Sequence, residues 1–239
     1  MTVVFDLDGT TIFKGKVMSE AVAEAIRCLS KKRQVVFASA RPIRDMLPVL
    51  PEDFHQFDLI GGNGAFTRQN KTIQTTPFSD GQIQLILDLI DKHQLNYMID
   101  SDWNYSYSGD TTHPLYLGID PNQTAQNVAI SELEMIVKTV LFTTNEEIIK
   151  ELKQADISVH FHGSEQLIDL SPTGISKWSA FDSLQLPTDF IMFGNDTNDL
   201  AMFDKATHSF VVGDVVTDVQ NATYITQDTV SEAILSLAK

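Results

Sequence analysis

Two aspartates follow directly after the first apolar run of the chain, in the segment Asp6-Leu7-Asp8-Gly9-Thr10. The run before them, from Thr2 to Phe5, is short and β-prone, which predicts a buried strand. In an extended segment residues i and i+2 project to one side, so the two carboxylates are expected to face the same site. Carboxylates held close together repel each other unless a cation lies between them, and Mg²⁺ prefers oxygen ligands. The segment therefore predicts a metal-binding acidic site at the end of a strand.

Short apolar runs alternate with helical patterns at both ends of the chain. A strand at 35–38 follows a segment from 18 to 29 that has helical apolar spacing, which completes a βαβ unit. Further strands are expected at 57–60, 191–193 and 210–212, and a helix at 199–205. This alternation predicts an α/β fold with a parallel sheet covered by helices.

The middle of the chain has an α+β pattern instead. Expected elements are a helix around 83–90, strands at 96–100, 103–107, 115–117 and 138–142, a helix opened by Thr144 with Glu147 as its capping box, and a hairpin of 157–161 with 167–170. We expect an inserted domain at 78–171 and one core formed by 1–77 and 172–239.

Charge and cysteine content exclude several classes of protein. The 239 residues carry 17 basic and 32 acidic side chains, a net charge of -15, which disfavours binding to nucleic acids or anionic membranes. Cys28 is the single cysteine, which fits a reducing compartment. No apolar run is long enough to span a membrane, and the first strand leaves no room for a signal sequence. We expect a cytoplasmic protein without an obligate protein partner.

Other polar residues follow the expected strands, at the edge where open α/β sheets bind ligands. Ser39 follows the second strand, although with Pro42 it could equally cap a helix. Lys177 follows the insertion, where a solvated helix lysine is the simpler interpretation. The segment Asn195-Asp196-Thr197-Asn198-Asp199 follows the strand at 191–193 and also suits a capped helix start.

Taken together, these motifs resemble the haloacid dehalogenase-like (HAD) phosphohydrolases, specifically the Cof-type subfamily with a C2-type cap inserted after the second motif. The resemblance extends over essentially the whole chain. It implies a Rossmann-like parallel-sheet core with an α+β cap domain. In that family the first aspartate is the nucleophile that becomes an aspartyl-phosphate, and the second is the general acid and base. Asp6 and Asp8 would take these roles, with Asp8 also binding Mg²⁺ through its backbone carbonyl.

The remaining motifs imply the other site residues. Ser39 and Asn198 would bind the phosphoryl group, Lys177 would neutralise its charge, and Asp199 would belong to the metal shell and support Lys177. Asn195 stands where the family has a metal-binding aspartate. Its amide oxygen can still bind Mg²⁺ but brings no charge, which predicts weaker metal binding.

Two residues are candidates for substrate contact, with an alternative for each. Arg41 could reach an anionic group of the substrate or pair with a surface carboxylate. Asn63 lies in the Gly62-Asn63-Gly64 turn, so it could contact substrate or simply form the turn. In Ala40 the chain departs from the subfamily's usual glycine before Arg41.

The function expected from these residues is Mg²⁺-dependent hydrolysis of a small soluble phosphomonoester, such as a sugar phosphate, through an aspartyl-phosphate on Asp6. Two alternatives stay open. A phosphomutase of the same fold would return the phosphoryl group to the substrate. A non-catalytic sensor of phosphate ligands is suggested by Asn195.

Overall fold

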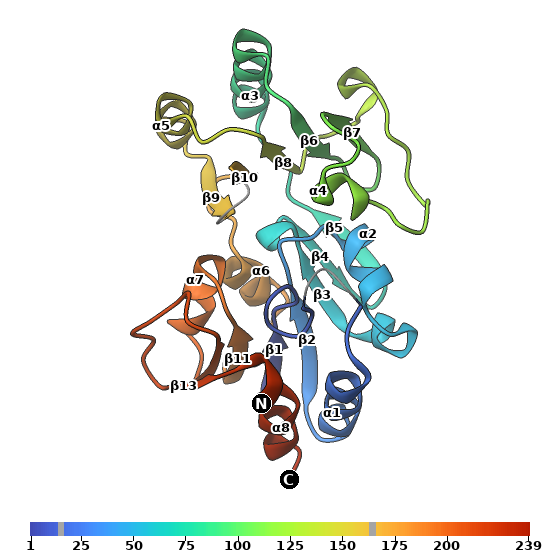
Figure 1. The fold of residues 1–239 in the computed structure, drawn as a ribbon, viewed down its shortest axis with the longest axis vertical. Helices are drawn as coiled ribbons and strands as arrows, with labels where there is room; N and C mark the ends of the chain where they lie inside the picture. The colour runs from blue at the N-terminus through green and yellow to red at the C-terminus, as the bar shows by residue number, and fades with distance from the viewer. Residues whose placement is uncertain (14–16, 163–165) are drawn as a thin grey trace. The chain divides into compact units, whose positions relative to one another are not determined.

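The computed structural model describes residues 1–13, 17–162 and 166–239, and its contacts divide the chain into two compact units. The core unit comprises 1–73 and 176–239, and the inserted unit comprises 74–175 (Figure 1). The boundaries expected from the sequence, at 78 and 171, lie within the inserted unit close to its ends. Each unit has its own sheet and its own apolar core.

The core unit is built on a parallel sheet with an antiparallel extension. Its strands are β1 (Thr2–Phe5), β2 (Gln34–Ala38), β3 (Asp58–Gly61), β4 (Phe66–Gln69), β5 (Thr72–Thr75), β11 (Phe190–Gly194), β12 (His208–Val212) and β13 (Ala222–Ile225). Their order is β13-β12-β11-β1-β2-β3-β4-β5, with β4 antiparallel to β3. From β1 the chain builds outward through β2 and β3, and later through β11, β12 and β13 on the other side. The α/β fold expected from the sequence is confirmed.

Helices bury the apolar side chains of this sheet. The helices of the core unit are α1 (Glu20–Ser30), α2 (Ile43–Met46), α6 (Lys177–Ser183), α7 (Leu200–Phe203) and α8 (Val230–Leu237), with 3-10 turns at Leu47–Val49, Glu52–Gln56, Gly62–Gly64, Thr197–Asp199 and Gln227–Thr229. Phe181 of α6 and Met202 of α7 pack on Val4 and Met192, whose side chains lie on one face of neighbouring strands. Alternate residues on the other face include Phe5, whose ring lies 4.9 Å from that of Phe193. The strands thus lie between side chains that are packed on both faces of the sheet.

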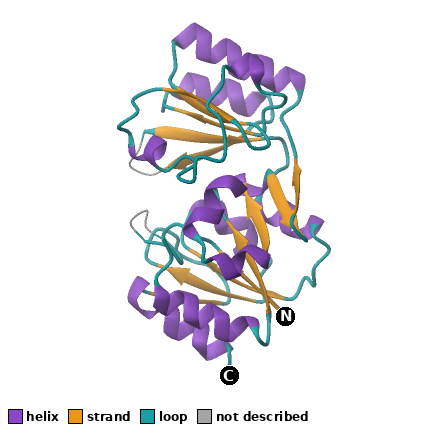
Figure 2. Cartoon of the chain, turned by 90° about the vertical axis from the view of Figure 1, so that its right-hand side faces the viewer, coloured by secondary structure: helices purple, strands orange, loops and turns teal. Residues whose placement is uncertain are grey.

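The inserted unit is an antiparallel sheet packed against two helices (Figure 2). The sheet runs β7-β6-β8-β10-β9, formed by β6 (Tyr97–Asp100), β7 (Tyr105–Ser108), β8 (Lys138–Leu141), β9 (Ser158–His162) and β10 (Leu167–Ser171). Its helices are α3 (Asp80–His93), α4 (Pro114–Leu117) and α5 (Glu146–Gln154), with a 3-10 turn at Ile130–Glu132. Ile86 of α3 and Leu152 of α5 share a core with Ile168 of β10. A reciprocal Ser79–Gln82 capping box starts α3.

Two sequence-based predictions in the inserted unit are wrong. The segment 115–117 is not a strand but belongs to α4, because Pro114 at its first position favours a helix start and the His113 ring accepts the Leu115 N–H. Asn145 rather than Thr144 caps α5, since its side chain accepts a hydrogen bond from the Glu147 N–H at 2.9 Å.

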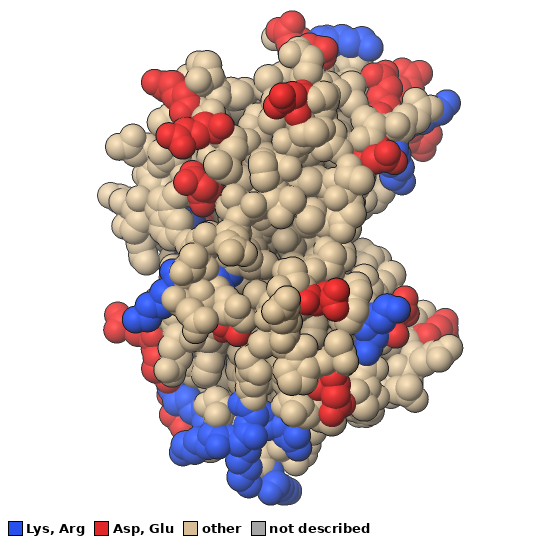
Figure 3. All heavy atoms as spheres, turned by 180° about the vertical axis from the view of Figure 1, so that it is seen from behind, with Lys and Arg blue, Asp and Glu red and all other residues tan. Residues whose placement is uncertain are grey.

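Charge is unevenly distributed over the molecular surface. On the face drawn in Figure 3, acidic side chains and several Lys and Arg are scattered, and a larger group of Lys and Arg gathers at the bottom of the view. Where α1 ends, the chain carries Lys31, Lys32 and Arg33 in succession, and Lys32 donates to the carbonyl of Lys239 at 2.9 Å. No helix in the described parts of the chain has the length and apolarity that a membrane span requires.

Candidate active site

Three of the predicted site residues follow neighbouring parallel strands. Asp6, Ser39 and Asn195 come directly after β1, β2 and β11. The register pairs Phe5 with both Phe37 and Phe193, so the three strand ends lie side by side. Such carboxyl ends, where the strand order reverses, are where open α/β sheets bind ligands.

A buried lysine joins two aspartates at the centre of this edge. The Lys177 ammonium donates to Asp6 Oδ1 and to Asp199 Oδ1, both at 2.7 Å. Lys177 and Asp199 are fully buried, and Asp6 is 4% exposed. Lys177 is the first residue of α6, where the helix dipole disfavours a positive charge, and Ser176 caps the helix. The two carboxylates overcome this cost, so the lysine is the charged centre of the site and not the solvated helix residue of the simpler interpretation.

The buried charges shift each other's protonation. Burial raises the pKa of Asp6 to about 7, and Asp199 and Asp8 act in the same direction, while the Lys177 ammonium opposes them. Burial lowers the pKa of Lys177, but the attraction of Asp199 and Asp6 is larger in sum and raises it above its usual value. Lys177 therefore keeps its charge, while Asp6 is close to its titration point at neutral pH.

Asp199 positions this lysine and also shapes the loop after β11. Its Oδ2 accepts hydrogen bonds from the backbone N–H groups of Asn195 and Asp196, at 2.9 and 3.2 Å. A Cβ at Gly194 would lie 2.6 Å from this oxygen, so the close approach needs glycine. Both carboxylate oxygens are thus engaged within the protein. The expected contact of Asp199 with Lys177 is present, and its place in a metal shell stays a prediction.

Asp8 lies in different surroundings. Both of its oxygens accept hydrogen bonds from Arg41, at 2.6 Å from Nε and 2.7 Å from Nη2. The Asp8 side chain is 46% exposed and that of Arg41 is 22% exposed. Of the two alternatives for Arg41, the structure shows the ion pair with a carboxylate. Its partner is Asp8, the second aspartate of the Asp6-Leu7-Asp8 segment.

Side-chain and backbone oxygens lie close together at Asp6, and their chemistry shows whether a metal ion would fit there. One terminal atom of the Asn195 amide lies 3.0 Å from the Asp8 carbonyl oxygen, 3.0 Å from Thr10 Oγ1 and 3.1 Å from Asp6 Oδ2. When that atom is Oδ1, carboxylate, carbonyl and amide oxygens meet at one place. Ligands of this kind suit Mg²⁺, so the residues fit the expected ion. Of these three ligands only the Asp6 carboxylate can carry a charge, and among the described residues no three His, Cys, Asp or Glu side chains form a metal-binding group.

The expected phosphate-binding residues lie on the loops around this centre. Ser39 is buried, and its hydroxyl accepts the Arg41 backbone N–H at 3.1 Å. Asn198 donates through Nδ2 to Oδ1 of Asn63 at 3.0 Å, while Asn198 Oδ1 is buried and has no hydrogen-bond partner in the described structure. Asn63 has a left-handed backbone (φ 55°), as its turn requires. The Asn63–Asn198 contact was not predicted, because nothing in the spacing of two distant asparagines indicates it.

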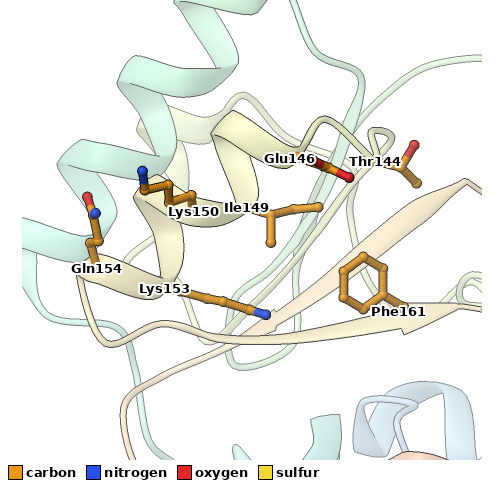
Figure 4. A pocket seen from close by; sticks show the side chains of 7 residues that line it. All are labelled: Thr144, Glu146, Ile149, Lys150, Lys153, Gln154 and Phe161. Atoms are coloured by element: carbon orange, nitrogen blue, oxygen red, sulfur yellow. The ribbon is translucent and has the colours of Figure 1, made fainter.

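A cavity of about 460 Å³ lies elsewhere, in the inserted unit (Figure 4). It is lined by Thr144, Glu146, Ile149, Lys150, Lys153, Gln154 and Phe161. The Lys153 ammonium lies 5.9 Å from the centre of the Phe161 ring. The cavity holds a single carboxylate and none of the predicted site residues. We therefore place the candidate active site at the strand ends of the core unit, where the paired carboxylates lie.

Comparison with known proteins agrees with this architecture. A family model described as haloacid dehalogenase-like hydrolase matches residues 3–237. The chain belongs to this family. The family and the hydrolase class expected from the sequence are thereby confirmed. A comparison with curated proteins gave no significant match.

Solved structures share the fold of this HAD-like hydrolase at low sequence identity. A haloacid dehalogenase-like hydrolase from Bacteroides thetaiotaomicron has a TM-score of 0.79 and 19% identity, over 99% of this chain and 100% of its own. The HAD subclass IIB sugar phosphatase BT4131 has a TM-score of 0.76 and 17% identity, over 98% of each chain. A HAD-like hydrolase from B. subtilis has a TM-score of 0.77 and 16% identity, over 98% and 99%. At such identities the similarity establishes the fold alone.

Proposed function

We propose that this HAD-like hydrolase is a phosphatase that hydrolyses a small phosphomonoester through an aspartyl-phosphate on Asp6. The observation that carries the proposal is the buried Lys177, whose ammonium donates to both Asp6 and Asp199 at 2.7 Å. A buried cation between two carboxylates is costly to assemble, and hydrophobic side chains in place of all three residues would stabilise the fold at least as well. The positive charge of Lys177 would stabilise the negative charge of a phosphoryl group bound beside Asp6, which explains why it is buried there.

The reaction divides into two displacements at phosphorus. An oxygen of Asp6 attacks the phosphorus, and the bond between phosphorus and the ester oxygen breaks while Asp8 gives that oxygen a proton. Water then attacks the aspartyl-phosphate, and Asp8 takes a proton from it. Inorganic phosphate leaves, and both aspartates return to their starting states. Ser39 and Asn198 bind the phosphoryl oxygens.

Arg41 constrains the proton transfer. Because both oxygens of Asp8 accept hydrogen bonds from Arg41, the guanidinium sets the orientation of this carboxyl group as long as the pair is intact. A phosphate or other anionic group of the substrate competes for the same guanidinium. Substrate binding would therefore free Asp8 for its role at the moment when a proton donor is needed.

The ion proposed for this site is Mg²⁺. Asp6, the Asp8 carbonyl and Asn195 would hold it, and when bound it supplies positive charge against the phosphoryl oxygens. The attack itself is made by Asp6 and the proton is transferred by Asp8, while Lys177 neutralises the charge of the bound phosphoryl group.

For the substrate we propose a sugar phosphate or a related small metabolite. Support comes from the fold shared with the sugar phosphatase BT4131 and from the acidic net charge of -15, which disfavours polymeric phosphodiesters. A phosphomutase of the same fold differs in its product, an isomeric ester in place of inorganic phosphate.

The test is phosphate release from a panel of sugar phosphates, nucleotides and cofactor phosphates, with Mg²⁺ or with a chelator. The Asp6→Asn variant serves as the matched control, because it keeps the shape of the side chain and removes the nucleophile. We expect release that needs Asp6, and a labelled aspartyl-phosphate after rapid quenching. Binding of these esters without turnover by a folded protein would refute the phosphatase and favour the sensor.

A further inference from the structure

The side-chain amide of Asn195 has one end among oxygen atoms. Which hydrogen bonds it forms there depends on whether that end is Oδ1 or Nδ2. Its inward atom is 3.0 Å from the Asp8 carbonyl, 3.0 Å from Thr10 Oγ1 and 3.1 Å from Asp6 Oδ2. If this atom is Oδ1, it faces acceptors apart from the Thr10 hydroxyl, while Nδ2 on the other side faces only donors. If it is Nδ2, both ends of the amide face complementary groups.

The same atoms have the spacing of metal ligands. In an octahedral shell with Mg²⁺–O bonds of about 2.1 Å, adjacent oxygens lie about 3.0 Å apart. The inward atom of Asn195 has this distance to both Asp6 Oδ2 and the Asp8 carbonyl. One position of the side chain therefore serves two purposes, as a hydrogen-bond donor through nitrogen or as a ligand through oxygen.

The surroundings of Asn195 keep the side chain in this position. Gly9 has φ of 83°, and a Cβ there would collide with the Asn195 amide. The backbone N–H of Asn195 is held by Asp199 at 2.9 Å. A half-turn of the amide about its last bond is the motion that exchanges the two ends without moving the loop.

We propose that the Asn195 amide, with its nitrogen inward, holds Asp6 Oδ2 and the Asp8 carbonyl together in place of the cation, and that Mg²⁺ binding requires the amide to turn its oxygen inward. With nitrogen inward, the N–H groups satisfy Asp6 Oδ2 and the Asp8 carbonyl, which otherwise repel each other. An aspartate at 195 has no such alternative and leaves a second carboxylate beside Asp6. The chain thus keeps its site assembled without the ion, at the cost of affinity for it. The inference rests on the proposed function only for the role of the ion.

The test measures binding of Mg²⁺ alone, by calorimetry and thermal unfolding of the full chain, with no substrate present. Asn195→Asp is expected to bind Mg²⁺ about tenfold or more tightly than the natural chain, because ligand charge sets affinity at such sites. Without the ion it should unfold at a lower temperature. Thr197→Asp, on an exposed residue, adds the same charge two positions away and is the matched control. It should resemble the natural chain in both measurements.

Equal Mg²⁺ affinity in the Asn195→Asp variant and the natural chain would overturn the proposal, as would equal stability of the two without the ion. A second measurement needs no variant: the side-chain NH₂ resonances of Asn195, followed by NMR during a Mg²⁺ titration, should shift as the amide turns. Resonances that stay fixed while the ion binds would contradict the exchange. Because none of these readouts needs turnover, a chain that behaves as expected but releases no phosphate would refute the phosphatase alone.

Discussion

Asp6 and Asp8 are separated by one residue, yet they lie in opposite surroundings. The buried side of the site, formed by Asp6, Lys177 and Asp199, is closed to solvent, with both ion pairs at 2.7 Å. On the exposed side, Asp8 is paired with Arg41, and both side chains are partly exposed. Removal from water strengthens electrostatic interactions on the buried side, whereas solvent weakens them on the exposed side. A nucleophile needs a fixed position, and a proton carrier needs to exchange partners, so the contrast suits the two proposed roles.

The largest effect is expected from the nucleophile on the buried side. Asp6→Asn should lower phosphate release by about 10⁴-fold or more, because the amide cannot attack phosphorus. Steady-state assays at saturating ester measure this, with circular dichroism to verify the fold. The Asp8→Asn variant should still form the aspartyl-phosphate from an ester with a good leaving group, which needs no proton. If Asp6→Asn forms the same phospho-enzyme, the two roles are assigned the wrong way round.

Removal of the buried ammonium should mainly affect stability. Lys177→Met leaves Asp6 and Asp199 buried without their cation, which is expected to lower the free energy of unfolding by about 3–5 kcal/mol. Urea denaturation measures the change. The matched control is Lys138→Met in the inserted unit, which removes another buried lysine, 2.7 Å from Asp169. Both should lose stability, but the Lys177 variant should lose more phosphate release. Equal losses of activity would reduce Lys177 to a structural role.

The titration of Asp6 predicts a pH dependence of stability. Its pKa of about 7 in the folded protein exceeds the ordinary aspartate value of 3.8, so the folded state holds an extra proton between these values. Stability from this group is therefore present at low pH and lost as the pH rises to about 7, with a slope of at most about 1.4 kcal/mol per pH unit. Unfolding of the chain in chelator at several pH values should show this slope, and Asp6→Asn should lack it. An identical slope in both would place the titration elsewhere.

The smallest effect on stability is expected on the exposed side. Arg41→Gln removes the pair with Asp8 and should lower the free energy of unfolding by about 1 kcal/mol or less, because solvent screens it. Thermal unfolding checks this. A loss as large as that of Lys177→Met would show that the two sides do not differ as the exposure of their side chains indicates.

The core of the site could be predicted because it depends on local patterns. A β-prone run ending in Asp6-Leu7-Asp8 constrains the backbone and the direction of both side chains. Parallel strands then bring Ser39 and Asn195 to the same edge, whatever the length of chain between them. The role of Lys177 beside Asp6 was expected only from the resemblance, and its burial was not predicted, since its own surroundings in the sequence suit a solvated helix as well.

Contacts between distant polar residues could not be predicted in this way. The pairing of Arg41 with Asp8 and the bond between Asn63 and Asn198 depend on loop conformations that no periodicity determines. In the inserted unit, the apolar residues at 115–117 fit a strand as well as one helical turn. The helix forms because Pro114 favours a helix start and the His113 ring caps it. These local interactions outweigh the strand preference of the short apolar run.

The position of Lys177 in the chain limits where the inserted unit could be joined if it were replaced by a unit from another protein. The inserted unit ends at residue 175, so its second junction lies two residues before this lysine, at the cap of α6. The first junction, within β5, is ten residues beyond Asn63. The backbone conformation of a replacement segment can therefore vary at its first junction. At its second junction it must place Ser176 in the conformation that begins α6. Chimaeras that vary the first joint and keep residues 172–177 should preserve the charge that the reaction needs.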